Sequence, residues 1–316
     1  MIEVKHLTKR YGSHTAVSDL SFTIEKGQIY GFLGPNGAGK STTMNIMTGC
    51  LAATSGEVKI GGYDIFEEAR QAKRLIGYLP EQPPVYLDRT PREYLSFVAR
   101  AKGVPEKKIG EQLEKVMGLT EITDMQDRLI KNLSKGYRQR VGIAQALLGD
   151  PEVIILDEPT VGLDPRQIME IRELIQKLGR DHTVILSSHI LSEVRSVCQT
   201  ILIISKGKLV ACDTPENLER LFAGTNTVEL TAEASEAEAR DILAQVPQVD
   251  AVTVRQDQDR CRIRLEGGTD GDSLCRDVFF AFSKAGRAIL RMNVAAASLE
   301  DVFLELTQGE KKEEQA

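Results

Sequence analysis

Apolar and polar residues follow two different patterns along the first two hundred positions of this chain. Residues 2–7 and 20–24 largely alternate apolar and polar side chains, which is typical of strands in a partly exposed sheet. Residues 28–34, 152–157 and 183–188 contain continuous apolar runs instead, which indicate buried strands. The chain therefore predicts two kinds of strand, one half-exposed and one fully buried.

Helical patterns lie between these strands. Residues 90–93 read Thr-Pro-Arg-Glu, an N-cap, a proline at the first helical position and a capping-box glutamate, so a helix is expected over about 91–102. Further helices are expected over residues 40–49, 105–118, 135–149, 165–179 and 190–198, with an edge strand over 57–62 and a hairpin over 201–212. Strands that alternate with helices predict an α/β fold with a largely parallel sheet and an antiparallel portion.

The pattern changes after about residue 222. Residues 223–227 predict a short linker, and the segments 227–233, 235–246, 249–256, 260–267, 271–286 and 288–295 read as β-α-β-β-α-β. That order is typical of a small α+β ferredoxin-like domain. A last helix is expected over 298–307, and the charged residues 309–316 predict a disordered tail. The domains expected are therefore 1–222, an accessory C-terminal domain over 223–308, and the tail.

Composition narrows the classes of function. The 316 residues carry a net charge of −6, which gives no basic surface for nucleic acid. No run of about 18 apolar residues suits a membrane-spanning helix, and the first residues do not form a signal peptide. The five cysteines are scattered without metal-ligand spacing, as expected for free or buried thiols in a reducing compartment. We therefore expect a cytoplasmic protein that reaches any membrane through a partner.

A glycine-rich segment at residues 34–41 carries the clearest chemistry. It fits the pattern G-x-x-x-x-G-K-[ST] between a buried strand and a helix, where backbone N–H groups and the helix N-terminus can hold phosphates. Lys40 would bridge the β- and γ-phosphates, and the Ser41 hydroxyl would ligate Mg²⁺. The alternative is a glycine-rich turn without a ligand. The candidate nucleotide contacts are Gly34, Pro35, Asn36, Gly37, Ala38, Gly39, Lys40, Ser41 and Thr42.

Two carboxylates follow the buried strand at residues 153–156. Asp157 can reach Mg²⁺ through water, while Glu158 can polarise the water that attacks the γ-phosphate. Two acids at a strand end are also common in solvated loops. Their pairing with the phosphate loop favours a role in hydrolysis.

The order of the phosphate loop, "LSKGYRQR", "VIILDEP", "VGLD" and "SSH" over residues 1 to about 220 resembles the ATP-binding subunits of ABC transporters. The resemblance implies a P-loop NTPase core, a helical subdomain at about 88–150, and ATP with Mg²⁺ as cofactors. It also implies roles for single residues: Tyr11 would stack on adenine, Glu158 would be the general base, and His189 would contact the γ-phosphate and orient water. Tyr11 and His189 each also have a purely structural alternative. Tyr11 would then be a packed surface tyrosine, and His189 a structural histidine whose hydrogen bonds are satisfied within the fold.

The resemblance leaves one metal contact open and contains departures. The loop that senses Mg²⁺ usually carries a glutamine, and here either Glu81 or Gln82 matches it. Asp164 matches a loop that signals between subunits, although Val161-Gly162 replaces the commoner Ser-Ala.

Ser134 and Gly136 match the family signature LSGGQ, whereas Lys135 and Tyr137 do not. Ser134 would cap a helix whose N-terminus suits an anion, and capping alone requires only that serine. Within the family, this element completes the ATP site of the opposite subunit, so the resemblance implies a head-to-tail homodimer around two ATP molecules. Arg138 and Arg140 would support that interface or be solvated helix charges.

The segments "GYLPE", "LSKGYRQR" and "SLEDVFLELT" are similar to ATPases of the bacterial ABC-2 export type. That similarity implies a multi-span permease as partner, a place on the inner face of the cell membrane, and contact with the permease through Tyr86 and Leu87. An alternative is a soluble ABC-type ATPase that acts on a non-transport assembly. Such proteins commonly carry two ATPase units or a coiled-coil insertion, and this sequence contains neither. A P-loop kinase or GTPase would not explain the signature or His189.

Overall fold

The computed structural model describes residues 1–222, 227–247, 249–257, 259–267 and 271–295. It divides into two compact units between Thr214 and Pro215. The predicted boundary lay eight residues later, after residue 222. The difference is the helix α8 (Pro215–Phe222), which groups with the second unit. A proline at this helix start cannot donate a ladder hydrogen bond, so the preceding strand ends before it.

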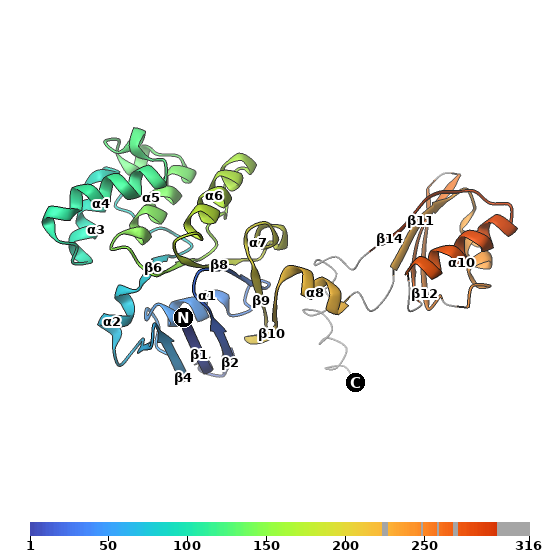
Figure 1. Cartoon of the computed structure of the whole chain (residues 1–316), viewed down its shortest axis with the longest axis horizontal. Helices are drawn as coiled ribbons and strands as arrows, with labels where there is room; N and C mark the ends of the chain where they lie inside the picture. The colour runs from blue at the N-terminus through green and yellow to red at the C-terminus, as the bar shows by residue number, and fades with distance from the viewer. Residues whose placement is uncertain (223–226, 248, 258, 268–270, 296–316) are drawn as a thin grey trace. The chain divides into compact units, whose positions relative to one another are not determined.

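The centre of the first unit is a six-stranded sheet in the order β10-β9-β3-β8-β7-β6 (Figure 1). Five of these strands are parallel, and β10 pairs antiparallel with β9. The strands are β3 (Ile29–Leu33), β6 (Ile76–Leu79), β7 (Val153–Leu156), β8 (Thr183–Ser188), β9 (Thr200–Ser205) and β10 (Lys208–Asp213). Because β3, β8 and β7 are parallel neighbours, the residues that follow them lie at one edge of the sheet. The phosphate loop, Asp157, Glu158 and His189 follow these three strands and therefore meet at this edge.

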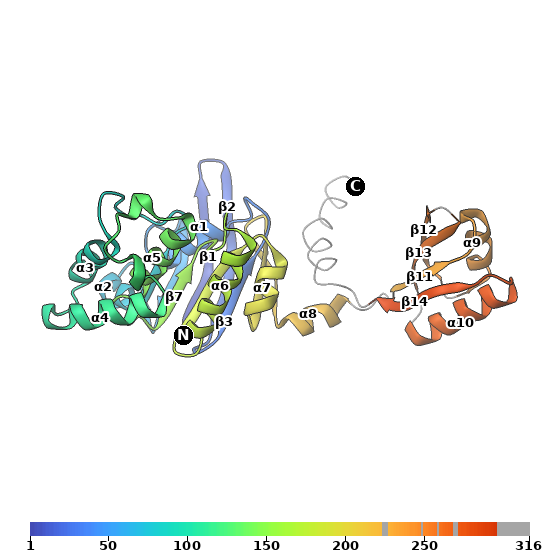
Figure 2. The ribbon, with the colours of Figure 1, turned by 90° about the horizontal axis from the view of Figure 1, so that it is seen from above.

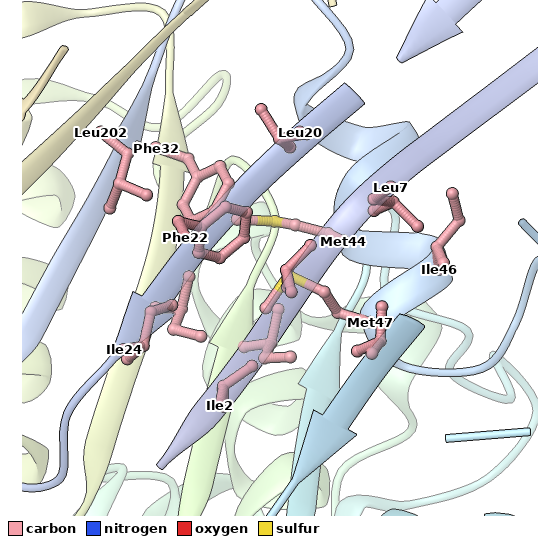
Figure 3. Close-up of a cluster of buried hydrophobic side chains, with 14 of the residues drawn as sticks. Ile2, Leu7, Leu20, Phe22, Ile24, Phe32, Met44, Ile46, Met47 and Leu202 are labelled. Carbon is pink, nitrogen blue, oxygen red and sulfur yellow. The ribbon is translucent and has the colours of Figure 1, made fainter. Parts of the chain in front are cut away.

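A second sheet, in the order β2-β1-β4-β5, is the antiparallel portion that the alternating pattern predicts. Its strands are β1 (Ile2–Tyr11), β2 (His14–Ile24), β4 (Ser55–Ile60) and β5 (Tyr63–Asp64). Its apolar side packs with the central sheet and α1 (Lys40–Met47) into one buried core (Figure 3). Within this core, the rings of Phe22 and Phe32 pack edge to face, with 5.3 Å between their centroids. This core anchors the helix that follows the phosphate loop.

Helices α3, α4 and α5 gather at one end of the first unit in both views (Figures 1 and 2). They fall within the stretch 88–150 that the resemblance marks as a helical subdomain. The capping box before α3 forms as predicted, since Thr90 and Glu93 exchange side-chain and backbone hydrogen bonds at 3.1 and 3.3 Å. The remaining helical segments are α2 (Ala69–Arg74), α3 (Pro91–Ala101), α4 (Glu106–Leu119), η1 (Thr123–Met125), η2 (Ile130–Asn132), α5 (Lys135–Leu147), α6 (Pro165–Leu178) and α7 (Leu191–Val197).

Most predicted elements of the first unit are present, and β5, α2 and β6 are among the elements that the sequence pattern did not predict. The sequence pattern did not predict β6, because its four residues include Gly77 and are too short to show a period. The hairpin at β9–β10 is present, and its turn residues Lys206 and Gly207 both have positive φ, as a type I′ turn requires.

The second unit contains a four-stranded antiparallel sheet in the order β12-β13-β11-β14, with α9 and α10. The element order β-α-β-β-α-β matches the prediction of a ferredoxin-like domain. The elements are β11 (Thr227–Ala232), α9 (Glu236–Leu243), β12 (Ala251–Asp257), β13 (Arg260–Glu266), α10 (Gly271–Lys284) and β14 (Ile289–Ala295). The unit has its own apolar core. The predicted helix at 298–307 and the predicted tail at 309–316 lie outside the described residues.

No helix in the described part of the chain has the length and apolar character to cross a membrane. All five cysteines are free thiols, as the sequence predicts.

Candidate functional site

The glycine-rich segment forms a tight loop between β3 and α1. Gly39 is the N-cap of α1 with φ at 104°, and a Cβ added there would lie 2.6 Å from the carbonyl oxygen of Ala16. A Cβ on Gly34 would lie 2.3 Å from the carbonyl oxygen of Ile204. Side chains at these positions would push the loop away from the sheet. The glycines thus let the backbone curl over the helix N-terminus, the arrangement that holds phosphate oxygens.

Lys40 is buried beneath this loop, although it carries a charge. Its Nζ donates to the carbonyl oxygens of Gly34 at 2.7 Å and Pro35 at 3.3 Å. The same Nζ lies 3.5 Å from Oε1 of Glu158. The ammonium group is therefore held at the loop by acceptors that a more strongly anionic phosphate can replace.

Asp157 lies next to α1, at the end of β7. The hydroxyl of Ser41 donates to its Oδ1 at 3.2 Å, and the hydroxyl of Ser187 donates to the same oxygen at 2.6 Å. Ser41 and Asp157 come from distant parts of the sequence and present two oxygen ligands side by side. Oxygen ligands of this kind suit Mg²⁺, which takes one or two protein ligands and completes its shell with water and substrate phosphates.

Glu158 is held in an unusual backbone conformation with φ at 49°. Its N–H donates to the hydroxyl of Ser187 at 2.8 Å, which fixes this strained position. Its side chain is 8% exposed, and its Oε2 lies 2.9 Å from Nδ1 of His189. The carboxylate therefore contacts the histidine through one oxygen and lies near the Lys40 ammonium through the other.

An open groove of about 460 Å³ lies over these groups. Tyr11, with half of its surface exposed, lines it beside Lys40, Ser41, Glu158 and His189. Glu81 also lines the groove, whereas Gln82 is not among the described residues that do. The other residues of the lining are His14, Ala16, Asn36, Gly37, Ala38, Gly39, Thr42 and Val161. We call this surface the phosphate-loop groove.

Ser134, Gly136 and Asp164 lie elsewhere, in a second groove that we call the signature groove. The hydroxyl of Ser134 accepts from the N–H of Tyr137 at 3.3 Å and caps α5. Oδ1 of Asp164 accepts from the N–H of Gln167 at 2.9 Å and caps α6. A Cβ on Gly136 would lie 2.8 Å from the side chain of Gln167, so glycine lets the two helix ends approach closely. Within one chain, the predicted site residues therefore fall into two separate surfaces.

The sequence profile of the family described as "ABC transporter" matches residues 17–161. The "Uncharacterized ABC transporter ATP-binding protein YhcH" of Bacillus subtilis (strain 168) is 38% identical over 320 residues, which cover 99% of this chain and 98% of that protein. The "Bacitracin transport ATP-binding protein BcrA" of Bacillus licheniformis is 35% identical over 98% of both chains. This chain belongs to the ABC transporter ATP-binding proteins.

Solved structures agree with this assignment. An ATP-binding subunit of an ABC transporter superposes with a TM-score of 0.64 at 30% identity, over 70% of this chain and 93% of the other. A dimeric ATP-binding cassette in a post-hydrolysis state, bound to ADP and Pi, gives a TM-score of 0.62 at 25% identity, over 68% of this chain and 98% of the other. The fold expected from the sequence, a P-loop NTPase core of the ABC type, is confirmed. The chain is an ATP-binding and ATP-hydrolysing transporter subunit.

Ser187 is a residue of this ABC ATPase that the sequence reasoning missed. It binds both acids after β7, through Oδ1 of Asp157 and the N–H of Glu158. The signal lay in the strand register, because β8 runs parallel beside β7 and pairs Leu186 with Leu156. The residue after Leu186 therefore lies beside the residue after Leu156.

The residues that depart from the family pattern make contacts inside the chain. The space beside Gly162 is occupied by the end of the exposed Lys135 side chain, since a Cβ on Gly162 would lie 2.1 Å from its Nζ. The hydroxyl of Tyr137 donates to Oδ2 of Asp124 at 3.1 Å, and this hydrogen bond raises the pKa of Tyr137. Lys135, in the signature, thus lies next to the loop that contains Gly162.

Arg140 is not a solvated helix charge, which was one of the two roles that the sequence left open for it. Its guanidinium is buried and pairs with Glu121 at 3.0 Å and Glu170 at 2.8 Å, and it donates to the carbonyl oxygen of Thr120 at 2.9 Å. A guanidinium held in this way joins α5 to α6 and to the end of α4, and the residue also lines the signature groove.

Proposed function

We propose that two copies of this chain pair head to tail around two ATP molecules and drive export through a separate membrane permease. The observation that carries the proposal is the separation of the two grooves. The phosphate-loop groove is lined by residues of the loop, Glu158 and His189, whereas Ser134 and Gly136 line the signature groove. A second copy can bring its signature groove over the first copy's phosphates, and two-fold symmetry repeats the contact. The dimeric cassette among the similar structures supports this arrangement.

Several residues of the phosphate-loop groove then have a task in ATP binding or hydrolysis. The backbone of residues 34–39 and Lys40 hold the β- and γ-phosphates, and Thr42 lies in the same lining. Tyr11 is exposed at the groove and can stack on the adenine ring. Glu158 takes the proton of the attacking water, and His189 orients the carboxylate and reaches the γ-phosphate. The position of Glu81 in the lining favours it over Gln82 as the residue that senses the metal.

The donor set fits Mg²⁺. Ser41 and Asp157 provide two oxygen atoms 3.2 Å apart, next to the place for the phosphates. These two residues would hold Mg²⁺, which would supply positive charge to offset the negative charge that develops on the phosphates during transfer. Ser187 holds Asp157 so that its oxygen faces Ser41.

Export is supported by the names of similar proteins. They include the "Nod factor export ATP-binding protein I" of Ralstonia nicotianae (strain ATCC BAA-1114 / GMI1000), which is 31% identical over 99% of this chain and 95% of that protein. We propose an ABC-2 type permease with several membrane spans as partner, and a place on the inner face of the cell membrane. We propose no nucleic-acid partner.

An exposed aromatic surface before and on α3 supports contact with such a permease. Tyr86, Leu87 and Phe97 are each about half exposed, and the ring of Tyr86 lies 5.6 Å from that of Phe97. Exposed aromatic clusters commonly mark protein interfaces. Because the cluster follows the loop that contains Glu81, movement of a permease can be transmitted to the nucleotide. We assign the C-terminal domain to regulatory or partner contacts.

Complementation between inactive variants tests the head-to-tail dimer. Lys40→Ala disables the phosphate-loop groove, and Ser134→Glu places a repelling charge in the signature groove. In a head-to-tail dimer of the two variants, one site combines an intact phosphate loop with an intact signature. Random mixing should then restore about a quarter of the parent ATPase activity, since half of the dimers carry one intact site of two.

The matched control mixes Lys40→Ala with Glu158→Gln. Both residues lie in the same groove, so no mixed dimer contains an intact site and the mixture should stay inactive. Recovery of activity in this control, or no recovery in the first mixture, would contradict the proposal.

Co-purification from membrane extracts would test the partner. A multi-span protein should co-purify with the parent chain and be lost with Tyr86→Glu or Phe97→Glu. Capture of a soluble assembly instead would favour the alternative class of ABC ATPase.

A further inference from the structure

A buried carboxylate outside the phosphate-loop groove connects two of the loops that form it. Glu193 lies in the first turn of α7 and is 5% exposed. The hydroxyl of Thr160 donates to its Oε2 at 2.7 Å, and the hydroxyl of Ser188 donates to the same oxygen at 2.9 Å. Burial of a carboxylate is costly unless its oxygens are bonded, so this contact is a specific feature and not an accident of packing.

The two donors belong to segments that carry different groups of the ATPase site. Thr160 is two residues after Glu158, in the turn where the N–H of Val161 donates to the carbonyl oxygen of Glu158 at 3.2 Å. Ser188 immediately precedes His189, and its hydroxyl also accepts from the N–H of Ile190 at 3.0 Å. Glu193 therefore sets the position of the chain after the general base and of the chain around the histidine.

The neighbouring serine forms a similar link on the other face of the strand. Ser187 and Ser188 are consecutive in β8, so their side chains point to opposite sides. Ser187 binds Asp157 and the N–H of Glu158, whereas Ser188 binds Glu193. The pair of Glu158 and His189 is thus supported from both faces of the strand.

We propose that Glu193 is a positioning residue for ATP hydrolysis. Through Thr160 and Ser188 it keeps Nδ1 of His189 within 2.9 Å of Oε2 of Glu158 while the loop of residues 159–164 engages a second copy. This role rests on the ATP hydrolysis assigned above and does not depend on the direction of transport. Because Glu193 touches neither Lys40 nor the phosphate loop in the described contacts, it should affect the chemical step and not nucleotide affinity.

Substitution with a residue of similar size tests the proposal. Glu193→Leu removes the acceptor, and a small displacement of the catalytic pair should lower kcat by about 10- to 100-fold with unchanged ATP affinity. Glu193→Gln should keep most of the activity, because both hydroxyls donate to a single oxygen that a glutamine carbonyl can replace. Glu173→Leu, at an exposed site on α6, is the matched control and should match the parent.

The donors provide an independent route if Glu193→Leu does not fold. Thr160→Val and Ser188→Ala each remove one hydrogen bond to Glu193 and should each lower kcat, with no further loss when either is added to Glu193→Leu. A parallel loss of ATP affinity and kcat would overturn the proposal, and so would a lower melting temperature with kcat unchanged. The proposal would also be overturned if Glu193→Gln lowered kcat as much as Glu193→Leu does. An unmodified chain that hydrolysed no ATP would overturn the proposed function together with this inference.

Discussion

Nδ1 of His189 lies 2.9 Å from Oε2 of Glu158, although the two residues are thirty-one positions apart in the sequence. The parallel pairing of β7 with β8 brings them together, since each residue follows the end of its strand. The carboxylate is buried and the histidine side chain is 39% exposed, so the histidine can reach the groove while it orients the acid.

This relationship makes Glu158 the group whose loss should stop hydrolysis most selectively. Glu158→Gln keeps the shape and the contact with His189 but cannot accept the proton of water. Hydrolysis should fall by about 10²- to 10⁴-fold, while ATP remains bound and the dimer is stabilised. Turnover and nucleotide binding measured on the same preparation separate the two effects. The surface variant Glu111→Gln serves as control, and ordinary turnover by Glu158→Gln would contradict the assignment of the base.

Lys40→Ala should act on binding instead. The ammonium provides charge-assisted hydrogen bonds to the phosphates, each worth about 1.5–3 kcal/mol. ATP affinity, measured by equilibrium titration, should therefore fall by at least about tenfold. An exposed lysine on α4, Lys107, provides the control when changed to alanine. Unchanged affinity in Lys40→Ala would show that the loop does not hold the phosphates as described.

Ser187→Ala should loosen the positioning of both Asp157 and Glu158. It removes the hydroxyl that donates to Asp157 and accepts from the N–H of Glu158, and it leaves a buried N–H without its partner. The free energy of unfolding should fall by about 1–3 kcal/mol, and hydrolysis should fall more than ATP affinity. Denaturant unfolding and steady-state kinetics would measure these changes. Full stability with full activity would mean that the serine is dispensable.

Gly162→Ala tests the backbone conformation of the loop that contains Asp164. The backbone φ of 69° at this position costs about 1–2 kcal/mol for other residues. The added Cβ would also lie 2.1 Å from Nζ of Lys135, but this atom ends an exposed, flexible side chain that can move aside. We therefore expect lower stability and weaker ATP-dependent dimerisation, and most of the loss should persist when Lys135→Ala is added. The stabilities of the two single variants and the double variant form a cycle, and full recovery of stability in the double variant would contradict the backbone explanation.

The ion pairs of Arg140 with Glu121 and Glu170 should make the stability of the fold sensitive to acid. A hydrogen bond from Arg140 lowers the pKa of Glu121. Because the folded state holds this carboxylate ionised, its contribution is complete above the unfolded pKa, about 4.3, and is lost as the pH falls through the folded value. Glu121→Gln should therefore lose less stability than the parent chain in acid below about pH 4.3, by a few tenths of a kcal/mol for so exposed a group. If both chains lost the same stability in acid, Glu121 would make no contribution to the acid sensitivity.

The site shows which groups a sequence can reveal. Gly34, Lys40 and Ser41 were predicted because a phosphate loop is formed by consecutive residues. The glycines that its backbone conformation requires are therefore visible in a short stretch of sequence. Asp157 and Glu158 were recognisable because they end an apolar run. Ser187 and Glu193 carried no local signal, since a serine in a strand and a glutamate in a helix are ordinary residues until strand pairing sets their neighbours.

The sequence by itself determined the order of most strands and helices, the phosphate loop, the change of character after about residue 222 and the family. These features depend on periodicity and on short-range backbone geometry, which neighbouring residues specify. Tertiary structure alone decided that Glu81 and not Gln82 lines the groove, that Arg140 is enclosed, and that Ser134 and Lys40 lie on separate surfaces. The reason is that contacts between residues far apart in the chain follow from the register of β3, β7 and β8 and from helix packing, and no local pattern encodes either.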